Sequence, residues 1–319
     1  MTALRKLRLS NTGVRGDIEK LQDLTGLEEL SLDNTYVSGD VENLHNLRGL
    51  RLLSLRNTGV HGDIEKLQHL TRIKELSLYN TGVHGDIENL QNFTDLEALY
   101  VSDTGLRGDI ENLQNLRVLE RLSLRNTEVQ GDVKYLQNLT GLQRLSLYNT
   151  GVSGDIENLQ KLTGLIKLFL SNTGVRGDIE NLQYLTGLKR LSLGDTGVGG
   201  DVENLQDLRG LRQLFLYNTG VRGQIKNPQK LTALEAVSLV NTNVQGDIEN
   251  LRTLTGLKEL SLDNTSTQGD IDALLNHLSL EVAKLRGTGV SGWISSTWNG
   301  CGSCIWGPGA ELHKHSRRK

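Results

Sequence analysis

The residue types best suited to bind a transition metal gather near the end of the 319-residue sequence. Cys301 and Cys304 are its two cysteines, and His313 and His315 follow them. Thiolate and imidazole groups are the usual ligands of structural zinc, but these histidines are too close in sequence for a zinc finger. We therefore expect a local disulfide or free thiols here, with no bound metal and no cofactor.

Carboxylates recur along the chain at a fixed interval and raise a second metal hypothesis. Asp17 is the first of eleven aspartates at this position of a 23-residue repeat, and Gln224 and Trp293 take the two remaining places. A stack of carboxylates is one way to bind cations. The same side chain also caps a helix, where one carboxylate per repeat accepts hydrogen bonds from backbone N–H groups. We expect the capping role.

Aromatic and basic side chains share another set of regularly spaced positions. Tyrosine and arginine supply much of the energy of protein interfaces, and arginine binds carboxylates through paired hydrogen bonds. These positions predict a surface for a protein or peptide that carries acidic groups. The candidate partner-binding residues are Tyr79, Tyr100, Arg121, Arg125, Arg144, Tyr148, Lys167, Phe169, Arg190, Phe215 and Tyr217.

The alternative interpretation is a solvated face whose tyrosines repeat by descent. Tyr79, Tyr148 and Tyr217 are 69 residues apart, or three repeats, which indicates duplication of a three-repeat block. An enzyme would need a nucleophile, a base or a metal ligand set that converges on one place. The exposed positions offer serine, tyrosine and arginine but no histidine. We therefore expect no catalytic residues and no enzyme activity.

The interval of 23 residues indicates the elements that position these side chains. Thirteen threonines, from Thr12 to Thr288, follow one another at this spacing without insertion or deletion. A fixed period of about 20 to 50 residues is typical of solenoids. In the first repeat Leu7 and Leu9 alternate as in a strand, and a run of apolar residues spaced by three from Ile18 favours 3₁₀ turns. We expect one short strand and one helical return in each coil.

The coils resemble those of the leucine-rich repeat family, whose core signature is LxxLxLxxNxL. Two of them read LTGLEELSLDNTYV and LTGLKRLSLGDTGV, and the resemblance covers residues 4 to about 294. The segment VRGDIENL is similar to the plant-type sequence LxGxIPxxL, without its proline. The resemblance implies an α/β fold: a right-handed, curved solenoid with a parallel β-sheet on its concave face and short 3₁₀ or α returns on its convex face.

Two columns of this alignment predict structural roles. The buried asparagine of the family falls on Thr12 and its equivalents, and we expect their hydroxyls to bond successive turns as a ladder. Gly16 and its equivalents are always glycine, which predicts a positive φ or a place without room for a side chain. Gly13 is replaced in four coils, so that column only prefers glycine. Because the tenth coil carries Gln224 and Pro228, we expect an irregular return there.

Bulk properties exclude several classes of partner. The net charge of −3 gives no general attraction for nucleic acid, and no apolar run is long enough to span a membrane. The first residues lack the apolar core of a signal peptide, so we expect a cytoplasmic protein, or an extracellular one if the chain is part of a receptor. We expect residues 1–294 to form one solenoid of thirteen coils, and residues 295–319 to form a Trp- and Cys-containing cap with a basic tail.

The first functional hypothesis, implied by the resemblance, is a non-enzymatic scaffold that binds a protein or peptide through its concave face. The alternative is the ectodomain, or a fragment of it, of a leucine-rich repeat receptor of the receptor-like kinase type. Glycosylation sequons at Asn92, Asn138 and Asn264 are compatible with it. Weaker alternatives are an inhibitor of a secreted hydrolase and an ice-binding protein. We do not expect a small-molecule partner.

Overall fold

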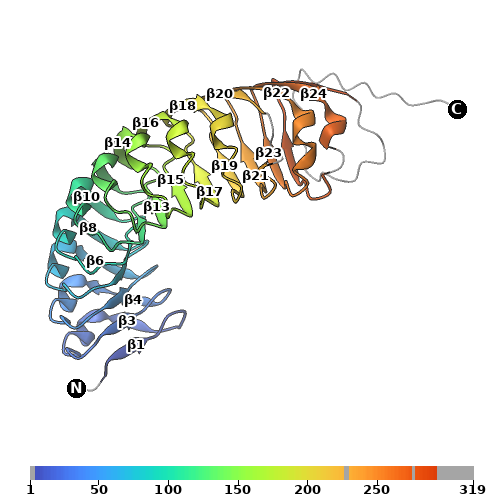
Figure 1. Ribbon diagram of the computed structural model, residues 1–319. Helices are drawn as coiled ribbons and strands as arrows, with labels where there is room; N and C mark the ends of the chain where they lie inside the picture. The colour runs from blue at the N-terminus through green and yellow to red at the C-terminus, as the bar shows by residue number, and fades with distance from the viewer. Residues whose placement is uncertain (1–3, 226–229, 275–276, 293–319) are drawn as a thin grey trace. The chain divides into compact units, whose positions relative to one another are not determined.

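The structure, a computed structural model, describes residues 4–225, 230–274 and 277–292 (Figure 1). Over these residues the strands form two parallel sheets, each of 13 strands. The odd-numbered strands form one sheet, here called the odd-strand sheet, and the even-numbered strands form the even-strand sheet. The chain packs as two compact units, Met1–Leu165 (unit 1) and Ile166–Lys319 (unit 2).

Unit 1 repeats the same three elements in every described coil. Its odd-numbered strands are β1 (Lys6–Arg8), β3 (Glu29–Ser31), β5 (Leu52–Ser54), β7 (Glu75–Ser77), β9 (Ala98–Tyr100), β11 (Arg121–Ser123) and β13 (Arg144–Ser146). Its even-numbered strands are β2 (Arg15–Asp17), β4 (Tyr36–Asp40), β6 (Gly59–Asp63), β8 (Gly82–Asp86), β10 (Gly105–Asp109), β12 (Glu128–Asp132) and β14 (Gly151–Asp155). Its 3₁₀ helices are η1 (Ile18–Leu21), η2 (Val41–Leu44), η3 (Ile64–Leu67), η4 (Ile87–Leu90), η5 (Ile110–Leu113), η6 (Val133–Leu136) and η7 (Ile156–Leu159). These helices lie along the outer side of the stack (Figure 1).

Unit 2 is built in the same way. Its odd-numbered strands are β15 (Lys167–Phe169), β17 (Arg190–Ser192), β19 (Gln213–Phe215), β21 (Ala236–Ser238), β23 (Glu259–Ser261) and β25 (Val282–Lys284). Its even-numbered strands are β16 (Gly174–Asp178), β18 (Gly197–Asp201), β20 (Gly220–Gln224), β22 (Asn243–Asp247), β24 (Ser266–Asp270) and β26 (Gly289–Ser291). Its described 3₁₀ helices are η8 (Ile179–Leu182), η9 (Val202–Leu205), η11 (Ile248–Thr253) and η12 (Ile271–Leu274).

The register of the odd-strand sheet places like residues on top of one another. Leu7 of β1 lies opposite Leu30 of β3, which lies opposite Leu53 of β5. Leu30 and Leu53 are fully buried, whereas Glu29, Ser31 and Leu52 beside them are half-buried. Burying a leucine side chain stabilises the fold by about 1.5–3 kcal/mol. The repeated leucines therefore form a continuous apolar column within each unit, and the predicted parallel sheet with 3₁₀ returns is confirmed.

Each coil contains a second strand that the sequence analysis did not predict. In β6 the buried residues Val60 and Gly62 alternate with the more exposed Gly59, His61 and Asp63. Two of these five residues are glycines, which have low β-propensity and contribute no side chain to an apolar pattern. The prediction of one strand per coil was wrong for this reason.

The repeated aspartates cap the 3₁₀ helices, as predicted. Asp17 Oδ1 accepts a hydrogen bond of 2.8 Å from the backbone N–H of Glu19, and its backbone is extended as at a typical N-cap. The following coil carries a glycine beside it: Gly39 has a φ of +115°, and a Cβ atom there would lie 2.3 Å from Asp17 Oδ1. The invariant glycine of one coil therefore leaves room for the cap of the coil before it.

The threonine column does not form the predicted ladder between coils. Thr58 Oγ1 donates to the carbonyl oxygen of Leu55 at 2.6 Å, and the other described threonines of the column bond within their own coils in the same way. A hydroxyl directed at the carbonyl three residues before it fixes the turn that ends the strand. The expectation of a threonine ladder was wrong, although the structural role of the column is confirmed.

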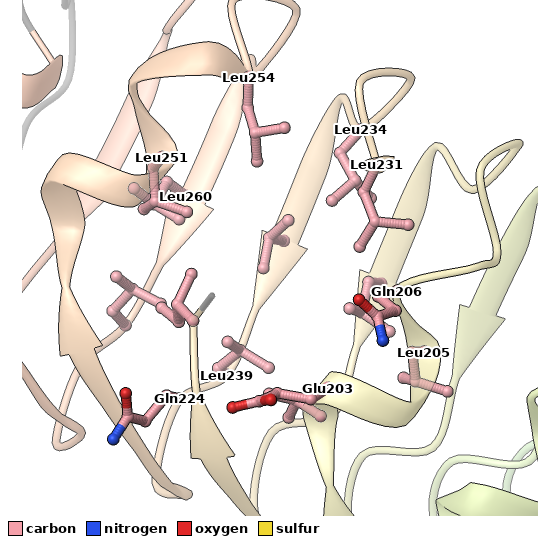
Figure 2. Close-up of a pocket in the computed structure, with 15 residues that line it drawn as sticks. Glu203, Leu205, Gln206, Gln224, Leu231, Leu234, Leu239, Leu251, Leu254 and Leu260 are labelled. Carbon is pink, nitrogen blue, oxygen red and sulfur yellow. The ribbon is translucent and has the colours of Figure 1, made fainter. Parts of the chain in front are cut away.

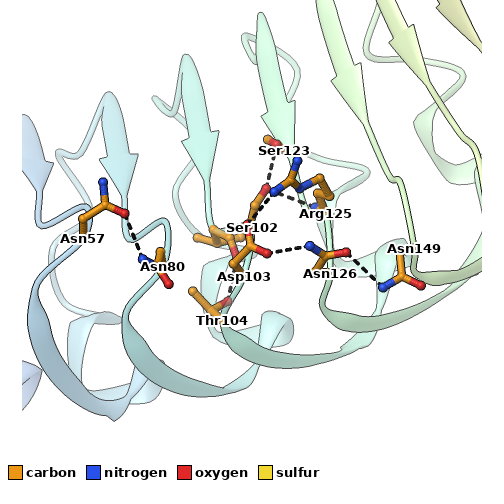
Figure 3. A network of polar contacts seen from close by, with 10 residues as sticks. Asn57, Asn80, Ser102, Asp103, Thr104, Ser123, Arg125, Asn126 and Asn149 are labelled. Atoms are coloured by element: carbon orange, nitrogen blue, oxygen red, sulfur yellow. Dashed lines mark hydrogen bonds and ion pairs between the residues drawn. The ribbon is translucent and has the colours of Figure 1, made fainter.

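The preceding column of asparagines links the coils instead (Figure 3). Asn57 Nδ2 donates to Asn34 Oδ1 at 2.6 Å, and Asn80 Nδ2 donates to Asn57 Oδ1 at 2.9 Å. These asparagines have φ near +55°, a conformation that asparagine tolerates better than most residues. Aspartate replaces asparagine at Asp103 and Asp195, and an ionised aspartate can only accept in such a ladder.

The tenth coil departs from the pattern around β20. Gln224 replaces the capping aspartate, and Pro228 lies outside the described residues, so the expected irregular return there stays a prediction. An apolar cavity of about 70 Å³ lies beside Gln224 and is lined mainly by leucines (Figure 2). Leu214 and Val237 are 6% and 7% exposed here, whereas most leucines of the core are fully buried. The cavity and this residual exposure show that the described core is loosened around the tenth coil.

Candidate functional site

Six of the eleven predicted partner-binding residues belong to unit 1. They lie on or next to the odd-numbered strands, at positions that alternate with the buried leucines, and each is half-buried or exposed. These residues are Tyr79, Tyr100, Arg121, Arg125, Arg144 and Tyr148. The odd-strand sheet places them on its outward face because neighbouring residues of a strand point to opposite sides.

A surface hollow of about 330 Å³ brings three of these six residues together. Tyr79, Tyr100 and Arg144 line it. The other lining residues are Arg56, Glu75, Ser102 and Ser123, from the same face of unit 1. The hollow extends over coils three to seven, whereas the predicted residues extend from coil four to coil ten.

Arg56 is a lining residue that the sequence analysis did not include in the site. Its guanidinium carbon lies 5.7 Å from the centroid of the Tyr79 ring, within the range of a cation–π contact. The sequence contained a signal for it, because Arg56 and Arg125 are three coils apart in the same column as the repeated tyrosines. Glu75 was not predicted because the candidate surface was defined by aromatic and basic side chains.

Arg125 is paired within the protein (Figure 3). Its Nη2 atom lies 3.2 Å from Asp103 Oδ2, and its backbone N–H donates to Ser102 Oγ at 3.1 Å. Asp103 stands in the asparagine column, outside the outward strand positions from which the candidate residues were predicted. Arg125 therefore already has an anionic partner within the protein.

Arg121 and Arg144 lie directly opposite each other on β11 and β13. Arg144 is exposed and reaches the hollow, whereas Arg121 is half-buried. The Nε atom of Arg121 is buried and has no hydrogen-bond partner among the described residues. Arg144 is therefore the better placed of the two to meet an external carboxylate.

The other five predicted residues belong to unit 2. Lys167 lies opposite Arg190, and Phe169 lies opposite Ser192, which in turn lies opposite Phe215. Tyr217 extends over Gly194, because a Cβ atom on that glycine would lie 2.3 Å from the Tyr217 Cζ atom. The predicted residues thus fall into two groups, one on each unit.

The described residues contain no group of three or more histidine, cysteine, aspartate or glutamate side chains that could hold a metal ion. Cys301, Cys304, His313 and His315 lie outside them. Among the same residues, no helix is both long and apolar enough to cross a membrane.

Neither a protein-family model nor a curated protein matches the sequence. Solved structures do match. One is the leucine-rich repeat ectodomain of the plant membrane receptor kinase GASSHO1/SCHENGEN3 from Arabidopsis thaliana, in complex with CASPARIAN STRIP INTEGRITY FACTOR 2. It has a TM-score of 0.80 and 24% identity, and the match covers 91% of this chain and 36% of that chain.

Two further structures are similar over most of the chain. The Arabidopsis receptor kinase HAESA, in complex with the peptide hormone IDA and the co-receptor SERK1, has a TM-score of 0.76 and 20% identity, over 94% of this chain and 61% of that chain. An internalin (inlF) from Listeria monocytogenes has a TM-score of 0.71 and 23% identity, over 96% of this chain and 87% of that chain. The chain therefore spans between about a third and three fifths of the two plant receptor chains. Together with the two sheets and the 3₁₀ returns, these matches show that the chain has the leucine-rich repeat solenoid fold.

Proposed function

We propose that this protein is a non-enzymatic recognition scaffold that binds a protein or peptide through the odd-strand sheet, with the hollow of unit 1 as a contact region. The observation that carries the proposal is the lining of that hollow: two tyrosines and two arginines on a face otherwise rich in serine. Tyrosine and arginine are over-represented among the residues that dominate binding energy.

The charges of the hollow favour an occupant with an acidic group. Arg56 and Arg144 contribute two positive charges and Glu75 one negative charge, which leaves a net charge of +1. A carboxylate of the partner would accept hydrogen bonds from Arg144, and the rings of Tyr79 and Tyr100 would supply apolar contact beside it.

The fold supports an extracellular recognition role. The GASSHO1/SCHENGEN3 structure is an ectodomain, and the HAESA structure contains a peptide hormone. We therefore propose that this chain is an extracellular receptor ectodomain or a part of one. The expectation of a cytoplasmic protein finds no support among these structures.

The test is a selection from a display library of short random peptides against the full chain. Selected peptides are expected to be enriched in aspartate and glutamate. Their affinity should fall as salt rises from about 0.15 M to about 1 M, because the Debye length shrinks from about 8 Å to about 3 Å. Arg144→Glu should weaken binding by about tenfold or more, since it replaces an attraction with a repulsion.

Arg117→Glu is the matched control, because Arg117 is an exposed arginine of unit 1 that does not line the hollow. Both variants should give the circular dichroism spectrum of the parent. Acidic peptides that bind Arg144→Glu as tightly as the parent would place their site outside the hollow, and a selection without acidic enrichment would refute the acidic partner.

A further inference from the structure

A tyrosine recurs every three coils on the odd-strand face, and the residue one coil before it is not the same in every copy. Arg56 precedes Tyr79 by one period of 23 residues, whereas Gly194 precedes Tyr217 by the same interval. The chain thus contains the same tyrosine position with and without a neighbouring arginine. Two copies have the arginine, Arg56 before Tyr79 and Arg125 before Tyr148, and they show how this face accommodates a guanidinium group.

The first copy shows a guanidinium on the ring. Arg56 lies over Tyr79 with 5.7 Å between the guanidinium carbon and the ring centroid. Tyr79 therefore presents a ring face that a guanidinium approaches, because the ring face attracts cations.

A second place shows a guanidinium on a turn aspartate. Arg125 reaches back to Asp103 in the preceding coil, with 3.2 Å between Nη2 and Oδ2, while Asp103 Oδ1 accepts a hydrogen bond from Asn126. The aspartate thus keeps its place in the asparagine column with one oxygen and binds the arginine with the other.

Unit 2 contains both acceptors without either arginine. Asp195 stands in the asparagine column as Asp103 does, and its Oδ1 atom accepts a hydrogen bond of 2.7 Å from Asn218 Nδ2. The position from which Arg125 reaches Asp103 is occupied by Tyr217 in this copy, and the position of Arg56 is Gly194. Asp195 is exposed and Tyr217 is half-buried.

No cation of these two columns neutralises Asp195. The two columns are the last outward position of the odd-strand sheet and the asparagine position that follows it. Over coils eight to eleven, Asp195 is the one charged residue in them. The eight residues are Ser171, Asn172, Gly194, Asp195, Tyr217, Asn218, Val240 and Asn241. Among the described residues, no basic side chain forms an ion pair with Asp195, whereas Arg125 pairs with Asp103.

We infer that Asp195 and Tyr217 form a subsite for the guanidinium group of an arginine in the bound peptide. The Asp195 carboxylate would accept its N–H groups, and the Tyr217 ring would contact its flat face. One arginine of the partner would then make in trans the two kinds of contact that Arg56 and Arg125 make separately in unit 1. The inference rests on the proposed peptide-binding function, and it adds a basic side chain to the acidic group expected at the hollow.

The test uses N-acetyl-arginine amide as the probe and N-acetyl-citrulline amide as its neutral counterpart of the same shape. Titration of the isotope-labelled full chain, followed by amide resonances in NMR, should shift the signals of Gly194, Asp195 and Tyr217. The arginine probe should bind about fivefold or more tightly than the citrulline probe, because only the former carries a charge.

Two variants of the site and one control complete the experiment. Asp195→Asn removes the charge and restores the asparagine found in most coils, so the variant should fold. Its affinity for the arginine probe should be lower than that of the parent by about fivefold or more. Tyr217→Arg should abolish the response, because it rebuilds the pair of Arg125 with Asp103. Asp207→Asn removes an exposed carboxylate of unit 2 outside this site and should leave binding unchanged.

Equal binding of the two probes, or an unchanged response in Asp195→Asn, would overturn the subsite. These outcomes are separable from failure of the proposed function. If selected peptides bind the hollow while the arginine probe does not respond, the subsite alone is refuted. If the probe responds as expected but no peptide can be selected, the subsite stands and the recognition function is refuted.

Discussion

At the scale of single residues, the asparagine column predicts a stability cost that depends on which property of asparagine is removed. Asn57 donates to Asn34, accepts from Asn80 and has a φ of +53°. Asn57→Gly keeps the backbone conformation accessible but removes both bonds, and should cost about 1–3 kcal/mol because each hydrogen bond is worth about 0.5–1.5 kcal/mol. Asn57→Ala should cost about 1–2 kcal/mol more, because alanine is strained at positive φ. Urea unfolding measures both.

Asn57→Asp is the matched control for that series. The aspartate still accepts from Asn80 and loses only the bond to Asn34, as Asp103 does in the native chain. Its loss of stability should be the smallest of the three. Equal midpoints for all three variants and the parent would show that the column does not stabilise the solenoid.

His277 is a residue whose position makes stability depend on pH. It occupies the place that Leu254 fills in the previous coil, and it is fully buried. Burial lowers the pKa of His277 below its ordinary value of 6.5, and Arg252 adds to this effect. The backbone carbonyl groups of Leu251 and Leu254 act on the pKa in the opposite direction and only partly offset the burial.

The folded protein therefore keeps His277 neutral at a pH where the unfolded chain already binds a proton. Above about pH 6.5, His277 should not change the free energy of unfolding with pH. Below that pH, the free energy of unfolding should fall on acidification, by at most about 1.4 kcal/mol per pH unit. His277→Leu should remove this part of the loss. The measurement compares urea midpoints of the parent and the variant at about pH 8 and about pH 5.5. The same pH dependence in both proteins would contradict the prediction.

At the scale of the repeated element, each 3₁₀ cap and the glycine of the next coil act as one device. Gly154 has a φ of +109°, and a Cβ atom there would lie 2.3 Å from Asp132 Oδ1, which caps η6. Gly154→Ala should cost about 2–4 kcal/mol, the sum of backbone strain and a disturbed cap. Gly16 has a φ of +125° with no atom in reach of a Cβ, so Gly16→Ala should cost only the strain.

A double-mutant cycle separates the two contributions to that cost. Asp132→Ala removes the carboxylate that the added methyl group of Gly154→Ala would meet. Gly154→Ala should therefore be less costly in that background by about 1 kcal/mol. Strictly additive effects in urea unfolding would show that strain alone excludes a side chain at this position.

Comparison of the coils with their sequence shows which elements a pattern can predict. The alternating leucines predicted the odd-numbered strands, because burial of one strand face requires an apolar residue at every second position. The aspartate before Ile18 predicted the capped 3₁₀ helices, because the helix start requires an acceptor for its backbone N–H groups. The even-numbered strands were missed because their glycines hide the alternation. The ladder was assigned to threonine because sequence alone does not show which of two adjacent polar residues reaches the next coil.

The candidate site was predictable only in part, for a related reason. Strand alternation identified the outward positions of Tyr79, Tyr100 and Arg144, which do line one hollow. Whether an outward arginine is free depends on side-chain contacts with other columns. Asp103 pairs with Arg125 from such a column, which alternation along the strand does not reveal.

At the scale of the whole molecule, the regular period predicts that complete coils can be removed without loss of the fold. In solenoids each coil packs mainly on its neighbours, and a deletion of one period keeps every column in register. Deletion of residues 25–47 would bring Asn57 opposite Asn11, so the ladder would close again. Deletion of residues 71–93 would remove Glu75 and Tyr79 and bring Asp103 opposite Asn57, where no ladder bond forms.

The two deletions are matched in stability but not in function. Around the deleted coils, Asn34, Asn57 and Asn80 each donate a ladder bond to the coil before, and either deletion leaves one such bond fewer. Both proteins should therefore fold, with similar circular dichroism and similar urea midpoints.

The deletion of 71–93 takes two lining residues from the hollow, whereas residues 25–47 contribute none. Acidic peptides selected on the parent should bind the 25–47 deletion unchanged and the 71–93 deletion about tenfold or more weakly, which corresponds to about 1.4 kcal/mol. Unchanged binding to both proteins would exclude the hollow as the contact region, and failure of both to fold would show that the coils are not independent units of stability.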